Sequence, residues 1–441
     1  MITTILAFIF VLGVLIFVHE LGHFLMARRI GVRVLTFSLG FGPKLLSFRR
    51  GDTEYCVSAI PLGGYVKMAG ESPEDTRTGA SDEFLSKTKW QRFQVLIMGP
   101  LMNLALAVIV MAGVLYQGAR FPVFEDEPVV VGSLIPGSTA ETSGVEVGDR
   151  VVRVEGREVP TWKAFNLAVA TRANRQTRLE IERGGRTIER QVVPAPIDKF
   201  ETGDIGVRPE IHPQIAEARP GQPAAEAGLV PGDVIMKAQG IANVSHEKLL
   251  ETIKNHEGKP LELEVVRDGH ARTVTVTPRV IDGAVRVGAI ITKIEFKTLK
   301  PGPLGALNAS VKQNWEWSAM IFRTLGGLFT RETSVKSLMG PVAIAGLSGE
   351  AAQQESWIPL FTLMAMISLN LGLLNLMPIP VLDGGHITIL ALEGISRRDF
   401  SMRVKEKMLL AGFVLLLMLM VTVIYNDLMR IQWIERFVPW R

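Results

Sequence analysis

The residues with the clearest chemical potential lie near the start of the chain, in the sequence HELGH from His19 to His23. On a helix, histidines four positions apart share a face, so His19 and His23 could bind the same metal ion. Glu20 lies about 100° further around the helix, where its carboxylate could hold a water beside the metal. Two imidazole ligands and a neighbouring general base are the arrangement that zinc-dependent hydrolysis requires.

The HELGH sequence lies at the end of an uncharged run. Every residue from Ile5 to Val18 is apolar or glycine, and Glu20 is the only charged side chain before Arg28. Ionisable groups at membrane depth are costly and usually indicate function. A chance match to the motif, or a hydrogen-bonded pair of structural histidines, would not explain this placement. We therefore predict a metal site within the membrane.

Composition indicates a membrane protein with a large aqueous part. Hydrophobic residues make up 47% of the chain, yet 21% of the residues are charged, more than membrane helices alone would need. The net charge of +4 is small and does not indicate a nucleic-acid partner. Cys56 is the single cysteine, which excludes an internal disulfide and a cysteine-based zinc site. Any metal ligands must therefore be histidine and carboxylate.

Four segments are long and apolar enough to span a bilayer: Ile2 to Ala27, Val95 to Gln117, Trp357 to about Leu376, and Met408 to Tyr425. The first lacks the basic start and the small-residue cleavage site of a signal peptide, so we expect it to be retained. Two shorter stretches, Trp315 to Phe329 and Ile387 to Ile395, are typical of amphipathic or re-entrant segments.

Basic residues predict the orientation of these spans. They are dense in the loop between the first two spans and in the loop between the last two. The positive-inside rule places both loops in the cytoplasm, and it places the N-terminus and the stretch from Gly118 to Ser356 on the other side. The HELGH sequence then lies toward the cytoplasmic end of its helix.

The long extracytoplasmic stretch contains an internal repeat. PGSTAETSGVEVGDRVVRVEG begins at Pro136 and PGQPAAEAGLVPGDVIMKAQG at Pro220, and their glycine and aspartate landmarks stay 84 residues apart. A constant offset indicates two copies of one module. Each copy predicts a short helix, a glycine stop and then alternating strands. The predicted helices and strands are Ala140 to Ser143, Ala224 to Ala227, Arg178 to Glu182 and Leu261 to Val266.

The first cytoplasmic loop contains short strand-like runs separated by glycine and proline turns. They are Leu35 to Leu39, Leu45 to Phe48, Tyr55 to Ile60 and Gly64 to Met68. Such strands could pair with a substrate that is unwound beside the HELGH helix. Alternatively, they form an ordinary hairpin that covers the membrane face.

A third metal ligand is expected from NLMPIPVLDGGH, Asn375 to His386. Prolines 378 and 380 break the helix and glycines 384 and 385 permit a tight turn. Unwound backbone at membrane depth must line a protein cavity. Asp383 is the acidic side chain of this segment, so we predict that it completes an open zinc site. Its alternative role is a helix N-cap.

Asn375 and His386 are further polar groups of the same segment. The Asn375 amide could donate to a developing oxyanion or hold a substrate strand. An interhelical hydrogen bond would explain it equally well. We interpret His386 as a supporting or structural residue.

Several motifs occur in the order seen in one known family. HELGH, PLGGYVKM, GPLMNLALA, the tandem repeat, GPVAIAG and NLMPIPVLDGG follow one another along the chain. The repeats resemble PDZ domains, which bind extended peptides at a sheet edge, although they could also act only as spacers. The chain as a whole resembles bacterial site-2 proteases, which are intramembrane zinc metalloproteases.

This resemblance implies roles for individual residues. His19, His23 and Asp383 would bind Zn²⁺, and Glu20 would be the catalytic base. The PLGGYVKM strand, with Gly63, Gly64 and Tyr65, would contact substrate together with Asn375.

The resemblance also implies a cellular role. Family members reside in the bacterial inner membrane and cleave single-span membrane proteins within the bilayer after a first protease has cut. The usual substrate is an anti-sigma factor in a stress response, and remnant signal peptides are a second class. The PDZ pair would act as a size filter.

We therefore expect a polytopic α-helical membrane protein with four transmembrane helices, a cytoplasmic membrane-associated β region and two α/β PDZ-like domains. The expected divisions are 1–117, 118–203, 204–282, 283–356 and 357–441, with the PDZ-like domains second and third. Two other interpretations are a non-catalytic metal-binding scaffold and a small transporter. Glu20 argues against the scaffold, and the missing inverted repeat argues against the transporter.

Overall fold

A computed structural model describes residues 2–71, 79–198, 201–330, 333, 338–354 and 356–429. The chain divides into two units. Met1–Ala119 together with Lys300–Arg441 form the first, which we call the membrane unit because it contains the predicted spans. Arg120–Leu299 form the second, which contains the duplicated sequence and is called the repeat unit.

Four helices in the described part of the chain are long and apolar enough to cross a membrane. They are α1 (Ile2–Arg29), α2 (Lys89–Gly118), α9 (Ile358–Asn375) and α11 (Met402–Met429). The four predicted long apolar helices are thus confirmed. The helices α1, α2 and α11 continue beyond the predicted ends, because polar and basic residues can extend a helix past the hydrocarbon. Arg28 and Arg29, for example, occupy the last turn of α1, where cations are favoured.

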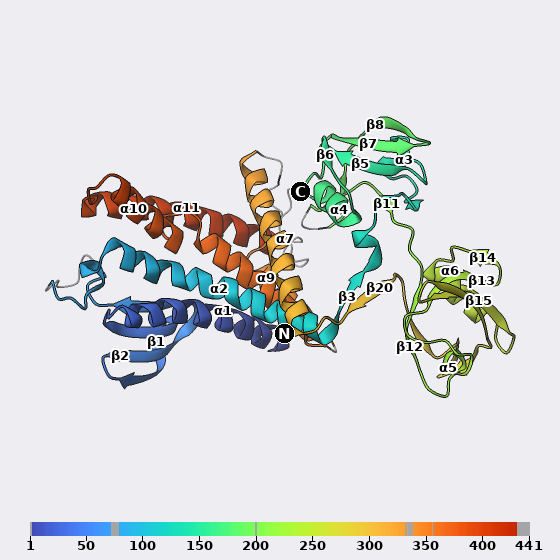
Figure 1. The fold of residues 1–441 in the computed structure, drawn as a ribbon, viewed down its shortest axis with the longest axis horizontal. Coiled ribbons are helices and arrows are strands. Elements are labelled where there is room, and N and C mark those ends of the chain that lie inside the picture. The colour runs from blue at the N-terminus through green and yellow to red at the C-terminus, as the bar shows by residue number, and fades with distance from the viewer. Residues whose placement is uncertain are drawn as a thin grey trace. The chain divides into compact units, whose positions relative to one another are not determined.

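Helix α2 lies between α1 and α9 and packs against both (Figure 1). Glycines allow the close approach: a Cβ added to Gly22 of α1 would lie 2.5 Å from the carbonyl oxygen of Met98. In α9, a Cβ added to Gly372 would lie 2.9 Å from Leu104. Small residues serve the same purpose in membrane bundles generally, because backbones must pack closely to gain dispersion energy.

The membrane unit also contains α7 (Pro303–Phe329), α8 (Pro341–Ala352), α10 (Asp383–Ile395) and a short 3-10 turn, η1 (Phe84–Ser86). The two shorter stretches of the sequence analysis fall within α7 and α10. On α7 the buried Ser310 hydroxyl donates to the Val108 carbonyl of α2 (2.7 Å), while Leu304 and Trp315 are exposed. A helix beside lipid is expected to turn its polar groups toward the protein and its apolar groups toward the lipid.

Two long bent strands, β1 (Val34–Arg50) and β2 (Thr53–Met68), follow α1 and contain all four predicted strand runs. They lie beside α1 (Figure 1). In β1, residues 36–39 pair with residues 64–67 of β2 on one side and with residues 54–57 on the other. Residues 44–50 then pair with residues 53–58. The segment 64–68 is therefore an outer strand of this sheet within the described residues.

The first module of the repeat unit has the sheet order β6-β5-β7-β8. Its elements are β4 (Ser133–Leu134), α3 (Thr139–Thr142), β5 (Arg150–Val154), β6 (Arg157–Glu158), α4 (Trp162–Ala170), β7 (Thr177–Arg183), β8 (Arg186–Val192), β9 (Ala195–Pro196), β10 (Gly203–Asp204) and β11 (Val207–Arg208). It is preceded by β3 (Ala119–Pro122), which pairs with β20 (Phe296–Leu299), and by η2 (Val123–Asp126).

The second module has the sheet order β16-β15-β13-β12-β19, with β14 on β13. Its elements are β12 (Gln214–Ala218), α5 (Pro223–Glu226), β13 (Val234–Ala238), β14 (Ile241–Ala242), α6 (His246–Lys254), β15 (Leu261–Arg267), β16 (His270–Val276), β17 (Arg279–Ile281), β18 (Ala284–Arg286) and β19 (Ala289–Thr292). Equivalent N-caps begin α4 and α6: the Thr161 and Ser245 side chains accept from backbone N–H groups three residues on.

Each module has its own hydrophobic core, which continues past the boundary expected from sequence. Ile205 and Val207 belong to the first core, beyond residue 203, and Val287 belongs to the second, beyond residue 282. The last strand of the first module, β11, pairs with β4, and the last strand of the second, β19, pairs with β12. These three side chains lie in β11 or just before the last strand of their module. The repeat landmarks, which lie earlier in each copy, contain no signal for these pairings.

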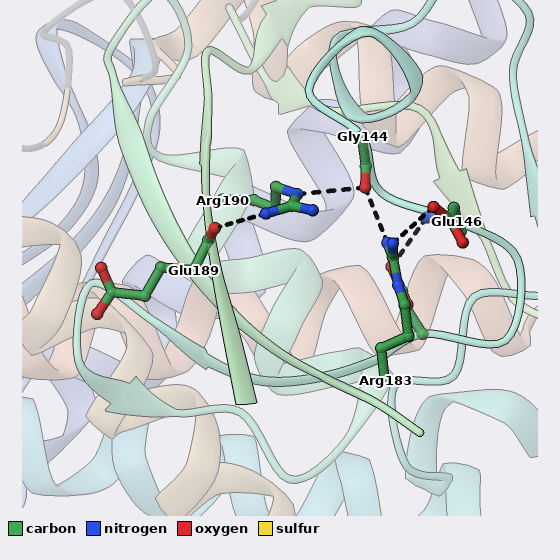
Figure 2. Close-up of polar contacts among 6 residues, drawn as sticks. Gly144, Glu146, Arg183, Glu189 and Arg190 are labelled. Carbon is green, nitrogen blue, oxygen red and sulfur yellow. Dashed lines mark hydrogen bonds and ion pairs between the residues drawn. The ribbon is translucent and has the colours of Figure 1, made fainter. Parts of the chain in front are cut away.

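A buried carboxylate pairs with arginine at the same place in both modules. Arg183 donates to Asp149 (2.6 and 2.7 Å) and to the Gly144 carbonyl (2.8 Å). Arg267 makes the same bonds to Asp233 (2.6 and 2.7 Å) and Gly228 (2.7 Å). Figure 2 shows this arginine in the first module, where Arg190 also donates to Gly144 and Arg183 reaches Glu146. In the first module this ion pair joins the turn before β5 to the end of β7. In the second it joins the turn before β13 to the end of β15.

Candidate metal centre

The two histidines of HELGH lie on one face of α1 and both are buried. Their Nε2 atoms are 3.2 Å apart. The imidazole planes are nearly perpendicular, with ring centroids 4.8 Å apart. The helical spacing thus places two nitrogen donors at one point, as predicted.

Asp383 reaches the same point from the other end of the chain. Its Oδ2 atom lies 3.2 Å from Nε2 of His19 and 3.5 Å from Nε2 of His23. It is the first residue of α10, and its side chain makes no capping bond, so the alternative N-cap role is not observed.

The turn before α10 depends on the predicted glycines. A Cβ added to Gly384 would lie 2.3 Å from the backbone of Leu376, and one added to Gly385 would lie 2.1 Å from the carbonyl oxygen of Ile379. No side chain fits at either position. The tight turn that brings Asp383 to the histidines therefore requires glycine.

The three ligand atoms fit a zinc ion. Their separations of 3.2, 3.2 and 3.5 Å match one face of a tetrahedron, since bonds of about 2.0–2.2 Å imply edges of about 3.3–3.6 Å. Within the described residues, these are the three His, Cys, Asp or Glu side chains that gather closely enough to hold one metal ion. Two neutral imidazoles and one carboxylate leave the fourth position open, as hydrolytic zinc sites require.

The predicted substrate strand lies beside Glu20. A Cβ added to Gly64 of β2 would lie 2.9 Å from Cγ of Glu20 and 2.8 Å from Ile16. Next to it, a Cβ added to Gly63 would lie 2.1 Å from the Phe41 ring, and Tyr65 stacks on that ring. Gly64 thus lets the strand approach α1 at the level of Glu20, and Gly63 leaves room for the Phe41 ring of β1.

Asn375 makes no hydrogen bond to this cluster within the described residues. It is the half-buried last residue of α9, and its side-chain amide has no hydrogen bond within the described part of the chain. The proposed interhelical bond is therefore not found there, and contact with substrate stays a prediction.

Helix α2 contributes groups that the sequence analysis missed. The Val95 carbonyl lies 2.9 Å from Nδ1 of His23, and Asn103 lies 3.3 Å from Nδ1 of His19. A Cβ added to Gly99 would lie 2.3 Å from Nε2 of His23. The sequence signal for these positions is the motif GPLMNLALA. It places an asparagine within an apolar span, where a polar side chain needs a hydrogen-bond partner.

A cavity of about 260 Å³ adjoins Asp383. Its lining combines apolar side chains with His386 and with the charged residues Arg92, Glu393 and Lys405. Glu393 is fully buried and was also missed. Its carboxylate lies 2.7 Å from Nζ of Lys405 and accepts the Phe400 backbone N–H (2.9 Å). These bonds tie α10 to the segment that leads into α11. His386 lines the cavity beside Asp383, and its supporting role stays a prediction.

Known proteins resemble this chain over nearly its whole length. The family described as peptidase family M50 matches residues 7–419. The regulator of sigma E protease of Salmonella typhi is 35% identical over 96% of this chain and 98% of its own, and RseP of Escherichia coli K12 is 33% identical over the same shares. A Neisseria meningitidis relative whose name includes "zinc metalloprotease" is 32% identical over 97% and 99%.

One solved structure, a PDZ domain of an SdrC-like protein from Listeria monocytogenes, aligns with 20% of this chain and 90% of that domain at 18% identity. Its TM-score is 0.17. The family relationship predicted from the motifs is confirmed by the sequence matches. The chain belongs to peptidase family M50 and is a protease of that family.

Proposed function

We propose that this protein is an intramembrane zinc metalloprotease that cleaves transmembrane segments of single-span membrane proteins. The observation that carries the proposal is the meeting of His19, His23 and Asp383. The two histidines and Glu20 lie on α1, which is apolar enough to cross a membrane. His19, His23 and Asp383 would hold Zn²⁺ as ligands. When bound, zinc supplies Lewis acidity at the scissile carbonyl.

Glu20 would move the proton in this reaction. Its carboxylate takes a proton from the attacking water and later returns that proton to the leaving amine, so the same side chain serves as base and then as acid. The buried surroundings of His19 and His23 exclude bulk water from the site. Electrostatic interactions are correspondingly stronger there.

We propose that substrate binds as an added strand. Residues 64–68 pair with β1 on one side, and no further strand covers their other side within the described residues. A substrate segment that pairs there would be extended next to Glu20. Asn375 would hold this strand or donate to the oxyanion. Because a stable helix shields its carbonyls, we expect substrates to have helix-weakening residues near the cut.

The relatives' names suggest the physiological substrate. Two of them are regulators of sigma E, so we propose an anti-sigma factor that a first protease has already shortened, with remnant signal peptides as a second class. The protein would act in the bacterial inner membrane. The basic loops and the metal site would face the cytoplasm and the repeat unit the extracytoplasmic side.

We further propose that the second module acts as a PDZ domain. A groove of about 600 Å³ runs between α6 and β19 and is lined by Leu250, Ile253, Ile291 and basic side chains that include Arg286. Strand β19 is an edge of its sheet. An extended peptide could add to this edge, with apolar side chains against α6. The alternative is that both modules are spacers that filter substrates by size.

The test is cleavage of a tagged single-span substrate in membranes. Glu20→Gln should lower the rate by ~10²–10⁴-fold, because the general base is lost, and should keep its zinc. Asp383→Ala should lose both zinc and activity. Glu350→Gln, on the exposed surface of α8, is the matched control and should cleave normally. Cleavage by Glu20→Gln at the wild-type rate would show that this centre does not perform the cleavage, and the site would then be only a metal-binding scaffold.

A further inference from the structure

One face of α2 supports both histidines of the metal centre. Val95, Gly99 and Asn103 follow one another at intervals of four residues, so they share a face of the helix. Val95 contacts Nδ1 of His23, Gly99 leaves room for the His23 ring, and Asn103 contacts Nδ1 of His19. Val95 and Asn103 therefore meet the Nδ1 side of the imidazoles, opposite the Nε2 atoms that face Asp383.

A histidine that binds metal through Nε2 carries its proton on Nδ1, and that N–H needs an acceptor. For His23 the acceptor is the Val95 carbonyl, at 2.9 Å. For His19 the atom nearest to Nδ1 in the structure is Nδ2 of Asn103, at 3.3 Å. A donating amide nitrogen there would require the proton on Nε2 of His19, which is the atom that faces Asp383 at 3.2 Å.

The other end of the Asn103 amide resolves this conflict. Asn103 is completely buried, and its Oδ1 has no hydrogen-bond partner within the described residues. Amide oxygen and nitrogen are assigned from their hydrogen bonds, since the two orientations have the same shape. Turning the amide over places Oδ1 against Nδ1 of His19, so the oxygen accepts the imidazole N–H.

The backbone of Asn103 is held in place from the other side. The Ser368 hydroxyl of α9 donates to the Asn103 carbonyl at 2.8 Å, and both residues are fully buried. Asparagine within a span is costly unless it is bonded. A fixed backbone leaves the amide to select between its two orientations.

We propose that Asn103 is a positioning residue whose carboxamide oxygen accepts the Nδ1–H of His19 and leaves Nε2 free to bind metal. The inference rests on the proposed zinc site and adds the partner that orients its first ligand. Loss of such a partner usually weakens metal binding by about 10–100-fold.

The experiment measures metal affinity of the purified full-length protein in detergent, by competition with a chelator. Asn103→Leu keeps the size of the side chain but has no acceptor, and it should bind zinc about 10–100-fold more weakly. Asn103→Asp retains an acceptor oxygen and should bind zinc nearly as tightly as wild type. Asn314→Leu removes another buried asparagine of the membrane unit, on α7, and should leave affinity unchanged.

The visible spectrum of the cobalt-substituted protein adds a readout that does not depend on catalysis. Asn103→Leu should alter the spectrum of the tetrahedral site, whereas Asn103→Asp and Asn314→Leu should retain it. If Asn103→Leu does not fold, Asn103→Ala takes its place in the comparison with Asn103→Asp. Wild-type affinity in Asn103→Leu, or equal weakening in Asn103→Asp, would overturn this inference alone. A wild-type protein that binds no zinc would overturn the proposed function as well.

Discussion

Asp149 in the repeat unit and Asp383 in the membrane unit are both largely removed from solvent, but their partners differ. Asp149 receives two hydrogen bonds from the Arg183 guanidinium. Asp383 faces His19 and His23, and within the described residues no lysine or arginine forms an ion pair with it. Arg183 thus neutralises the charge of Asp149. Asp383 has no such permanently charged partner among the described residues, so its negative charge is available to attract a metal ion.

The comparison separates structural from functional burial of charge. Asp149 and Asp233 recur at equivalent positions with the same arginine geometry, so they belong to the construction of the module. Asp383 is placed by a broken helix and two glycines that no side chain could replace. Substitutions should therefore have opposite consequences for stability in the two units.

The largest effect is expected for Asp383→Asn. Cleavage should fall by at least ~100-fold, since a metal ligand is lost rather than a supporting group. The metal-free protein should be as stable as wild type or more stable, because the substitution removes a largely buried carboxylate that no lysine or arginine pairs with in the described residues. Substrate cleavage and the thermal midpoint of the chelator-treated protein measure the two effects. A lower midpoint would show that Asp383 already has a compensating partner in the metal-free state.

Gly99→Ala should come next. The new Cβ would lie 2.3 Å from Nε2 of His23, so the ring must move and metal affinity should fall by about 10–100-fold. Gly113→Ala is the control. Gly113 lies on the same helix, and a Cβ added there would have no neighbouring atom within 4 Å. Zinc content at fixed free zinc distinguishes them. Equal zinc content in the two variants would mean that the site tolerates displacement of His23.

Asp149→Ala should destabilise the repeat unit without touching the metal centre. It leaves the Arg183 donors and the Glu146 backbone N–H without their acceptor, which should lower the free energy of unfolding by about 1–3 kcal/mol. Asp233→Ala should behave alike. Denaturant unfolding and zinc content of the full-length protein test this pair. If only one of the two variants were destabilised, the ion pair would not contribute equally to the stability of the two modules.

The smallest effect concerns pH. Burial alone would raise the pKa of Asp149, but the hydrogen bonds from Arg183 and from the Glu146 N–H outweigh burial and hold it below its usual value. The carboxylate therefore stabilises the folded state fully above its unfolded pKa of about 3.9, and this contribution is lost as pH falls through the lowered folded value. Unfolding measured from neutral to acidic pH should show a weaker acid dependence for Asp149→Asn than for wild type.

The sequence predicted the spans and the ligand set because both depend on local patterns. A continuous apolar run indicates a membrane helix, and the interval between His19 and His23 places two imidazoles on one face. Asp383 could be selected because it is the acidic residue of a segment that prolines and glycines interrupt. The repeat offset likewise predicted the modules, although their last strands extended beyond the expected ends.

The supporting residues could not be predicted in the same way. Gly99 and Asn103 matter because of side chains on a different helix, and Gly64 matters because β2 bends back to Glu20. Glu393 is buried only because α10 folds against the segment of Lys405. In each case the partner lies on another element, so the spacing of residues within one segment does not identify the contact.

By itself, the sequence determined which residues have metal-binding chemistry and which segments enter the membrane, since side-chain type and hydrophobic periodicity are properties of the local chain. Only the tertiary structure decided that Asp383 meets the two histidines and that α2 presents acceptors behind them. Such convergence depends on how helices pack, and packing is set by the shapes of surfaces that lie far apart in the sequence.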